Sequence, residues 1–271
     1  MGLMMRVNLL GNLALVAVFI AGCSPDSPDR FQGYIEGEYV YVASPLGGTL
    51  QQLDIARGDE VNAGQRLFEL ERRSEADAAR QASNDLALAK ANLALSETTL
   101  VRREQLRSDQ GVISAEELDR ARAQRDTDQA EVAAKTAALA KARWSFDQKE
   151  QFAPANAYVQ DTLYRVGEWV GAGKPVVQLL PPSNLKVRFF VPETILPEIK
   201  PGQGVRVTFD GARHPYTATV NYISTSAEFT PPVIYSQENR AKLVYMIEAK
   251  FAAADAADLR PGQPVDVKLG Q

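Results

Sequence analysis

One segment pattern occurs twice in this chain, and the two copies lie far apart. When the sequence is displaced against itself so that Pro45 lies over Pro154, residues 45–70 align with residues 154–179 without a gap. Seven of the 26 aligned positions are identical, where background composition gives roughly two. Several of these residues are glycines or prolines, which fix turns. The identical pairs are Pro45/Pro154, Gln51/Gln160, Gly58/Gly167, Val61/Val170, Ala63/Ala172, Gly64/Gly173 and Leu70/Leu179. We therefore expect the copies to be the two halves of one small β-sandwich, 45–70 and 154–181.

The segment between the copies has the composition of a long helix. From Gln65 to Ala153 there is no proline and a single glycine, Gly111, close to the middle. Apolar residues recur every seven positions on both sides of it, and only Arg125 interrupts the series: Ala79, Leu86, Leu93 and Leu100, then Leu118, Val132, Leu139 and Phe146. Such spacing gives each helix one apolar stripe that needs a partner. Two equal arms around one glycine predict an antiparallel coiled-coil hairpin over 71–153, with its tip near 109–114.

The length of this hairpin follows from helix geometry. Each arm of about 35 residues is roughly 50 Å long at the rise of an α-helix. The alternative is a helical bundle domain of no special function. That alternative does not explain why the second copy of the repeat resumes in register after the insert.

The C-terminal third changes to the alternating pattern of β-strands. Two Pro-Gly pairs, Pro201-Gly202 and Pro261-Gly262, each precede alternating valines and suit the centre of a type II turn. We expect a small β-barrel over 182–271, with residues 31–44 supplying an N-terminal strand to it. The sequence Gly202-Gln203-Gly204 is not a phosphate-binding loop, because no helix follows it.

The N-terminus has the pattern of an export signal. A basic residue, Arg6, precedes an apolar stretch that is too short to span a membrane comfortably. The stretch ends in Ile20-Ala21-Gly22-Cys23, which resembles the bacterial lipobox, where cleavage precedes a cysteine that becomes lipidated. We therefore predict a lipoprotein signal peptide at 1–22, lipidation of Cys23 and a polar tether over 23–30. The alternative is an ordinary signal peptide or a short anchor helix with an incidental cysteine.

Composition argues against several classes of function. The net charge of −4 gives no electrostatic reason to bind nucleic acid. One histidine and one cysteine leave almost nothing with which to build a transition-metal site. His214 lies in a hairpin-like connection and is expected to be a surface turn residue. The carboxylates show no catalytic spacing, so we expect neither a metal nor enzymatic activity.

The repeated pattern G-(D/E)-x-V-x-A-G, at Gly58 and again at Gly167, resembles the biotinyl/lipoyl domain. In carrier members of that fold, a lysine at the turn between the halves bears the cofactor. Here the first half runs into Glu71-Arg72-Arg73, and the nearest lysines, Lys90 and Lys149, lie inside helical sequence. We therefore expect no cofactor. A carrier subunit of an enzyme is the weaker alternative.

The order of lipid anchor, split lipoyl-like domain, helical hairpin and barrel resembles the periplasmic adaptor, or membrane fusion protein, family of HlyD-like secretion proteins. The stretch from Ile223 to Phe251 is similar to adaptors that serve ABC-type exporters. The resemblance implies an α+β multidomain protein without enzymatic activity. It also implies a bridge from an inner-membrane transporter, by this similarity one of the ABC type, to a TolC-like outer-membrane channel. Such adaptors work as homo-oligomeric rings, often hexameric.

The resemblance also implies a location. A periplasmic protein with its lipid in the inner membrane is expected from the family. The position after the lipidated cysteine sorts bacterial lipoproteins, however, and Ser24 would favour the outer membrane in enteric bacteria, so which membrane holds the lipid stays open. The competing interpretation of the whole chain is a structural coiled-coil envelope lipoprotein without a role in transport.

The hairpin tip carries the candidate contact residues. In adaptors that meet TolC-like ducts, an arginine is followed by a leucine four residues on and a serine seven after that. Arg103 and Ser114 have the matching separation, but residue 107 is arginine and the nearest leucine is Leu106. The resemblance thus implies channel contact by Arg103, Leu106, Gly111 and Ser114. The alternatives are a solvated surface role for Arg103 and a capping box in which Ser114 is the N-cap and Glu117 is N3.

Overall fold

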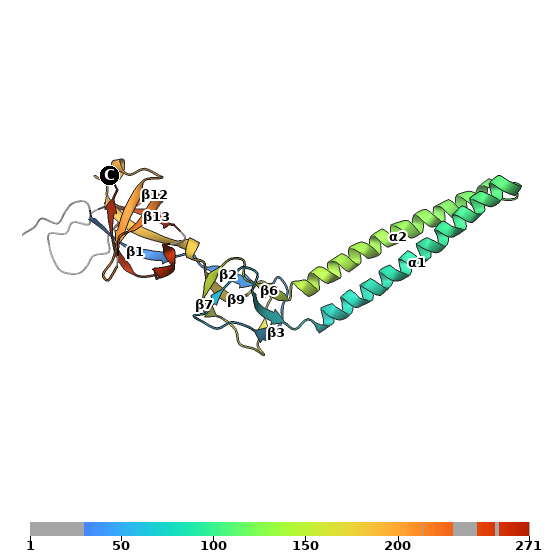
Figure 1. Cartoon of the computed structure of the whole chain (residues 1–271), viewed down its shortest axis with the longest axis horizontal. Coiled ribbons are helices and arrows are strands. Elements are labelled where there is room, and N and C mark those ends of the chain that lie inside the picture. Colours follow the sequence, from blue (N-terminus) through green and yellow to red (C-terminus); the bar gives the residue numbers. More distant parts are fainter. Residues whose placement is uncertain (1–29, 213, 230–242, 253–254, 271) are drawn as a thin grey trace, which may run out of the picture. The chain divides into compact units, whose positions relative to one another are not determined.

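The structure, a computed structural model, describes residues 30–212, 214–229, 243–252 and 255–270 (Figure 1). Cys23 and the predicted signal peptide lie outside the described residues. The chain divides into two compact units. One unit is Glu38–Asn184, and the other combines the first described strand with the residues from Leu185 onward.

Within Glu38–Asn184, which is described throughout, eight short strands form the predicted sandwich. One sheet has the order β2-β9-β7-β4: Val40–Ala43, Pro175–Leu180, Ala157–Thr162 and Glu60–Val61. The other has the order β6-β5-β3-β8: Glu150–Phe152, Arg66–Leu70, Gly48–Leu53 and Trp169–Val170. Apolar side chains of both repeat copies fill the core, among them Leu50, Leu67, Phe68, Val159 and Val176. The two sheets therefore share a core to which each copy contributes.

The repeat in the sequence is a repeat in the structure. Strands β3, β4 and β5 of the first copy correspond to β7, β8 and β9 of the second copy. The strands of each pair begin at aligned positions of the repeat. The paired turn glycines have matching left-handed backbones, with φ of 96° at Gly58 and 94° at Gly167. The copies also exchange equivalent hydrogen bonds, from the Gly58 N–H to the Val159 oxygen at 2.9 Å and from the Gly167 N–H to the Leu50 oxygen at 2.8 Å. The expectation of two halves of one β-sandwich is confirmed.

Two predicted boundaries need correction. Residues 31–44 are not one strand of the barrel, because β1 (Arg30–Gly37) pairs in the barrel while β2 pairs with β9 in the sandwich. The hairpin interval 71–153 extends too far, because its last residues form β6, which pairs with β5. Strands β2 and β6 are themselves related by the same displacement as the two copies, and they have the same register against β9 and β5. The repeat therefore begins before residue 45.

The predicted hairpin consists of α1 (Arg73–Gln110) and α2 (Ala115–Asp147), which lie side by side in Figure 1. Three residues of the predicted heptad series, Leu86, Leu118 and Leu139, are buried. Ala89, Ser96 and Ala121, each three residues after a position of that series, are buried as well, and these six residues are here called the inner stripe. The antiparallel coiled coil is confirmed. Arg125, which interrupts the stripe, is half-buried and its Nε lies 2.9 Å from the Asp126 carboxylate.

Among the described residues of the other unit, six strands close into the predicted barrel in the order β1-β10-β13-β12-β11-β14. The later five strands are β10 (Leu185–Pro192), β11 (Gly204–Thr208), β12 (Tyr216–Phe229), β13 (Leu243–Phe251) and β14 (Pro264–Leu269). Alternate residues, such as Ile35, Val187, Phe189 and Ile247, are fully buried, as the alternating pattern predicts. The glycines of both Pro-Gly pairs have positive φ, 87° at Gly202 and 82° at Gly262.

Candidate functional site

The hairpin tip is a short turn closed by Gly111. Helix α1 ends at Gln110, and Gly111 adopts a left-handed conformation with φ 63° and ψ 15°. Its N–H donates to the Arg107 carbonyl oxygen at 3.2 Å. This is the way a glycine commonly ends a helix, since it has no side chain to strain the backbone. Gly111 is thus placed by chain geometry at the end of the hairpin, where the sequence predicted it.

Ser114 starts the returning helix, and the predicted capping box is present. The Glu117 N–H donates to the Ser114 hydroxyl at 3.1 Å, and the Ser114 N–H donates to the Glu117 carboxylate at 3.0 Å. The hydrogen bonds from the Ser114 backbone and hydroxyl lower the pKa of Glu117, and the nearby Arg103 and Arg120 charges add to this effect. A lowered carboxyl pKa means that the capping contribution is present above the ordinary value of 4.5 and is lost as pH falls through the lowered value.

Arg103 belongs to the same cluster as the capping box. Its Nη1 donates to the Glu117 carbonyl oxygen at 3.1 Å, from one arm of the hairpin to the other. The side chain is half-buried, so it is not a freely solvated surface residue. Arg103 and Ser114, eleven positions apart in the sequence, therefore both converge on Glu117. Contact of either residue with another protein remains a prediction.

Three apolar residues complete the end of the hairpin. Leu106 and Ile113 are half-buried, whereas Val112, in the turn, is strongly exposed. Val112 was missed by the sequence reasoning because it belongs to no motif. The signal that could have found it is its place between the turn glycine and the N-cap, where neither arm can cover it. The tip thus presents an exposed valine between the turn glycine and a half-buried isoleucine.

A groove of about 560 Å³ lies between the arms below the tip. Its lining includes Leu95, Ser96, Thr99, Arg103 and Ala121. Ser96 and Ala121 are both buried between the arms, and their small side chains leave this part of the inner stripe incompletely filled. The groove is therefore a consequence of small residues at the helix–helix contact.

The capping box gives a first testable prediction. Ser114→Ala removes the hydroxyl that accepts from the Glu117 N–H, and loss of an N-cap costs about 1 kcal/mol. We expect hydrogen exchange of the Glu117 and Leu118 amides at neutral pH to become roughly fivefold faster. Ser108→Ala is the matched control, because the Ser108 hydroxyl donates to the Gln105 carbonyl oxygen within α1 and caps nothing. Equal exchange in both variants would show that the cap does not hold the turn.

The structure revises the position of one lysine considered as a cofactor site. Lys149 does not lie inside a helix; it follows the end of α2 and is only 5% exposed. Its Nζ lies 3.0 Å from the Glu75 carboxylate and donates to the Gly47 carbonyl oxygen at 2.7 Å. Lys90 lies in the middle of α1 and is exposed. Lys149 is thus held by ion-pair and hydrogen-bond partners at the junction of the two sandwich halves, and the absence of an attached lipoate or biotin stays a prediction.

No cluster of three or more histidine, cysteine, aspartate or glutamate side chains in the described part of the chain has a metal-binding arrangement. None of the described helices combines the length and the apolar composition needed to cross a membrane.

Comparisons with known proteins agree with this architecture. A family model, "RND MFP, alpha-helical hairpin domain", matches residues 78–149. The UPF0194 membrane protein YbhG of Salmonella paratyphi B is 30% identical over 315 aligned positions, which cover 94% of this chain and 94% of that protein.

Solved structures share the fold. The membrane fusion protein Spr0693 from Streptococcus pneumoniae R6 has a TM-score of 0.64 at 21% identity, covering 89% of this chain and 98% of that one. MacA from Actinobacillus actinomycetemcomitans has a TM-score of 0.68 at 17% identity, covering 89% and 78%. A lipoyl-like sandwich split by a helical hairpin and accompanied by a barrel defines an adaptor type of fold. The chain belongs to the membrane fusion protein, or periplasmic adaptor, family.

Proposed function

We propose that this protein is a non-enzymatic periplasmic adaptor subunit that links an inner-membrane transporter of the ABC type to a TolC-like outer-membrane channel. The lipid on Cys23 holds one end at a membrane, and the hairpin reaches toward the channel. The observation that carries the proposal is a second apolar stripe on each arm of the hairpin, which a self-contained hairpin does not need.

This outer stripe is defined by Leu88 and Leu95 on α1 and by Ala123, Ala130, Ala137 and Trp144 on α2. Leu88 and Leu95 each follow a leucine of the heptad series by two residues, which is about 200° round the helix. Both are strongly exposed, at 64% and 68%. On α2 the three alanines are exposed and Trp144 is 50% exposed. On α1 the outer stripe lies beside the inner stripe, because Leu88 and Leu95 directly precede the buried Ala89 and Ser96, and Leu95 also lines the groove between the arms. On α2 the outer stripe lies on the side of the helix away from the inner stripe.

The chemistry of the outer stripe suits a ring of identical copies. Leucines on one arm and small alanines on the other are the two sides of a knobs-into-holes contact. Because the two surfaces differ, α1 of one copy would meet α2 of the next, and such head-to-tail contacts close into a ring when the rotation permits. We propose a homo-oligomeric ring on this basis, with the hexamer expected from the family.

The tip is the proposed contact with the channel. Arg103, Leu106, Gly111 and Ser114 lie at the end of the hairpin together with exposed Val112. The capping role of Ser114 does not exclude contact, because its side chain is exposed. An exposed valine at the end of a hairpin whose tip also carries arginine and serine side chains suits a small interface with an apolar centre and a polar rim.

Two substitutions at the tip test this contact. Arg103→Glu reverses a charge, and Ser114→Asp preserves the N-cap while changing the contact surface. We expect both variants to keep a normal circular dichroism spectrum and to lose site-specific cross-linking to the outer-membrane channel in cells. Arg80→Glu is the matched control, since Arg80 is an exposed arginine of the same arm near the root. Undiminished cross-linking of both tip variants would contradict docking through this tip.

A further inference from the structure

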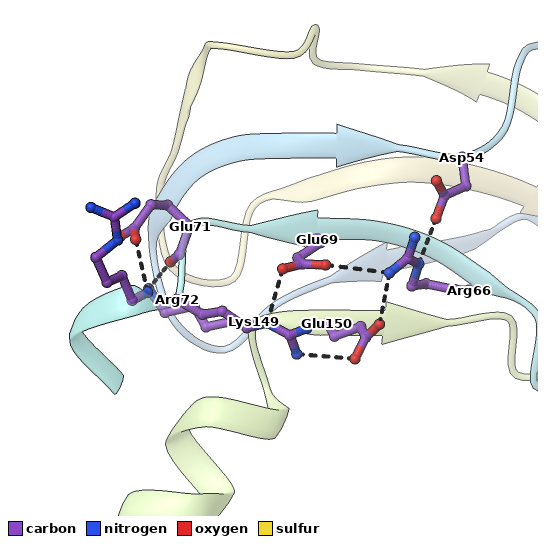
Figure 2. A network of polar contacts seen from close by, with 8 residues as sticks. Asp54, Arg66, Glu69, Glu71, Arg72, Lys149 and Glu150 are labelled. Atoms are coloured by element: carbon purple, nitrogen blue, oxygen red, sulfur yellow. Dashed lines mark hydrogen bonds and ion pairs between the residues drawn. The ribbon is translucent and has the colours of Figure 1, made fainter. Parts of the chain in front are cut away.

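A closed circuit of ion pairs lies where the hairpin joins the sandwich. Arg66 contacts Glu69 at 3.3 Å and Glu150 at 3.2 Å, and Arg72 contacts the same two carboxylates at 2.9 Å and 3.1 Å. Figure 2 shows Glu69 and Glu150 linking the two arginines, with Asp54 extending the circuit from Arg66. Each of the four side chains in the circuit is at least partly buried. The circuit therefore ties the residue before α1 to the strand after α2.

Arg72 and Lys149 extend the connection into both arms. The Arg72 guanidinium lies over the ring of Phe146, near the end of α2, at 4.5 Å. Lys149, just after α2, pairs with Glu75 in the first turn of α1. The other oxygen of Glu75, Oε2, is buried and has no hydrogen-bond partner among the described residues. The first turn of α1 and the last turn of α2 are thus held to each other through charged side chains.

Lys149 also ties the hairpin to the first copy of the repeat. Its Nζ donates to the Gly47 carbonyl oxygen at 2.7 Å and to the Glu71 oxygen at 3.3 Å. Beside it, the Ser44 hydroxyl donates to the Gln148 carbonyl oxygen at 2.7 Å. A Cβ added to Gly48 would lie 3.1 Å from the Lys149 Nζ, so the absence of a side chain at Gly48 leaves room for the ammonium. Three separate segments therefore meet at one buried cation.

The repeat supplies an internal comparison for these charges. The other half of the sandwich builds the same strands at the aligned positions of the repeat, but without a hairpin. The alignment of the repeat pairs each of seven charged residues with an uncharged one: Asp54 with Leu163, Arg66 with Pro175, Glu69 with Gln178, Glu71 with Leu180, Arg72 with Pro181, Lys149 with Val40 and Glu150 with Tyr41. Gly48 corresponds to an alanine. The sandwich strands therefore form without the charged residues, which occur only at the end that carries the hairpin.

We propose that this charged root, defined as Arg66, Glu69, Arg72, Glu75, Lys149 and Glu150, fixes the direction of the hairpin on the sandwich and so positions the tip. Lys149 and Arg72 are its central positioning residues, since each joins both arms. The distance to the tip gives the root its importance. At 1.5 Å per residue α1 is about 57 Å long, so a rotation of about 10° at the root moves the tip by about 10 Å. That a rigid root serves channel contact rests on the proposed function. That the root holds the hairpin rigidly on the sandwich does not depend on the proposed function.

Distances between two spin labels measure the rigidity directly. The labels are attached to two introduced cysteines, Ser108→Cys at the tip and Arg57→Cys on the sandwich. The background is the full-length protein with Cys23→Ala, which removes the single native cysteine. The spread of the distance between the labels reports how widely the hairpin moves relative to the sandwich. We expect a narrow distance distribution in this background and one broadened to the order of 10 Å by Lys149→Met. Lys90→Met is the matched control, because Lys90 is an exposed lysine of the hairpin, and it should leave the distribution narrow.

A second variant keeps the test decisive. Arg72→Gln breaks two ion pairs of the circuit without removing the buried lysine, and it should broaden the distribution as well. If Lys149→Met fails to fold, as shown by loss of its circular dichroism signal, the distance distribution of Arg72→Gln decides the test. Distributions as narrow as in the background, in every folded root variant, would overturn the proposal. Neither transporter nor channel enters the measurement, so a failure here is distinguishable from a failure of the adaptor function, which the tip cross-linking tests.

Discussion

Replacing Cys23 with alanine is expected to move the protein from the membrane fraction to the soluble fraction. The prediction rests on the lipobox-like Ile20-Ala21-Gly22-Cys23 at the end of a short apolar stretch. Each acyl CH₂ buried in a bilayer contributes about 0.8 kcal/mol, and two or more chains on one cysteine give stable anchoring where a single chain does not. Fractionation of wild-type and Cys23→Ala cells measures the effect, and mass spectrometry of the wild-type protein should show a diacylated or triacylated N-terminal cysteine.

The matched control for the anchor is Ser24→Asp. This change keeps Cys23 and its lipid, so the variant should remain in the membrane fraction, while the aspartate favours the inner membrane over the outer one. Density separation of the two membranes then shows which of them the Ser24 protein occupies. An unmodified Cys23 behind an intact Met1 would refute the lipid anchor.

The second large effect is expected from Leu95→Glu, which should convert the ring into monomers. Leu95 is the most exposed leucine of the outer stripe, and a carboxylate placed there would be buried against the neighbouring copy in a ring. An unpaired charge in such a contact is costly, whereas in the monomer it is solvated. Light scattering coupled to size-exclusion chromatography, on detergent-solubilised wild-type and variant protein, measures the change in mass.

Gln81→Glu is the control for the ring. It adds the same charge at an exposed position two heptads before Leu95, where the outer stripe has no apolar residue. The control should keep the mass of the wild-type assembly. An unchanged mass for Leu95→Glu would show that the outer stripe is not the contact between copies.

The sequence predicted those parts of the fold that are fixed by local residues. The turn glycines Gly58 and Gly167 and the break at Gly111 have the backbone conformations that their positions required, because only glycine adopts a positive φ without strain. The inner stripe was predictable from its heptad spacing, and the capping box from Ser114 and Glu117. These features depend on neighbours within a few residues.

The parts that escaped prediction depend on distant partners. Strand β2 (Val40–Ala43) was assigned to the barrel because its sequence has no glycine or proline in common with that of β6. The relation between β2 and β6 is visible only in the structure, where β2 pairs with β9 in the same register as β6 pairs with β5. The charged root joins Arg72 to Glu150 across 78 positions, and no local pattern connects such residues. Lys149 was placed inside the helix because no proline or glycine marks the end of α2.

The central claim is that this protein joins a transporter in one membrane to a channel in the other. Purification of the affinity-tagged full-length protein from chemically cross-linked cells, followed by mass spectrometry, tests it most directly. The adaptor function predicts that an ABC-type permease with its ATPase and a TolC-like outer-membrane channel are recovered in one complex, and that the channel is lost with Arg103→Glu. Recovery of only further copies of the protein and other envelope structural proteins would contradict the claim and identify the chain as a structural coiled-coil lipoprotein.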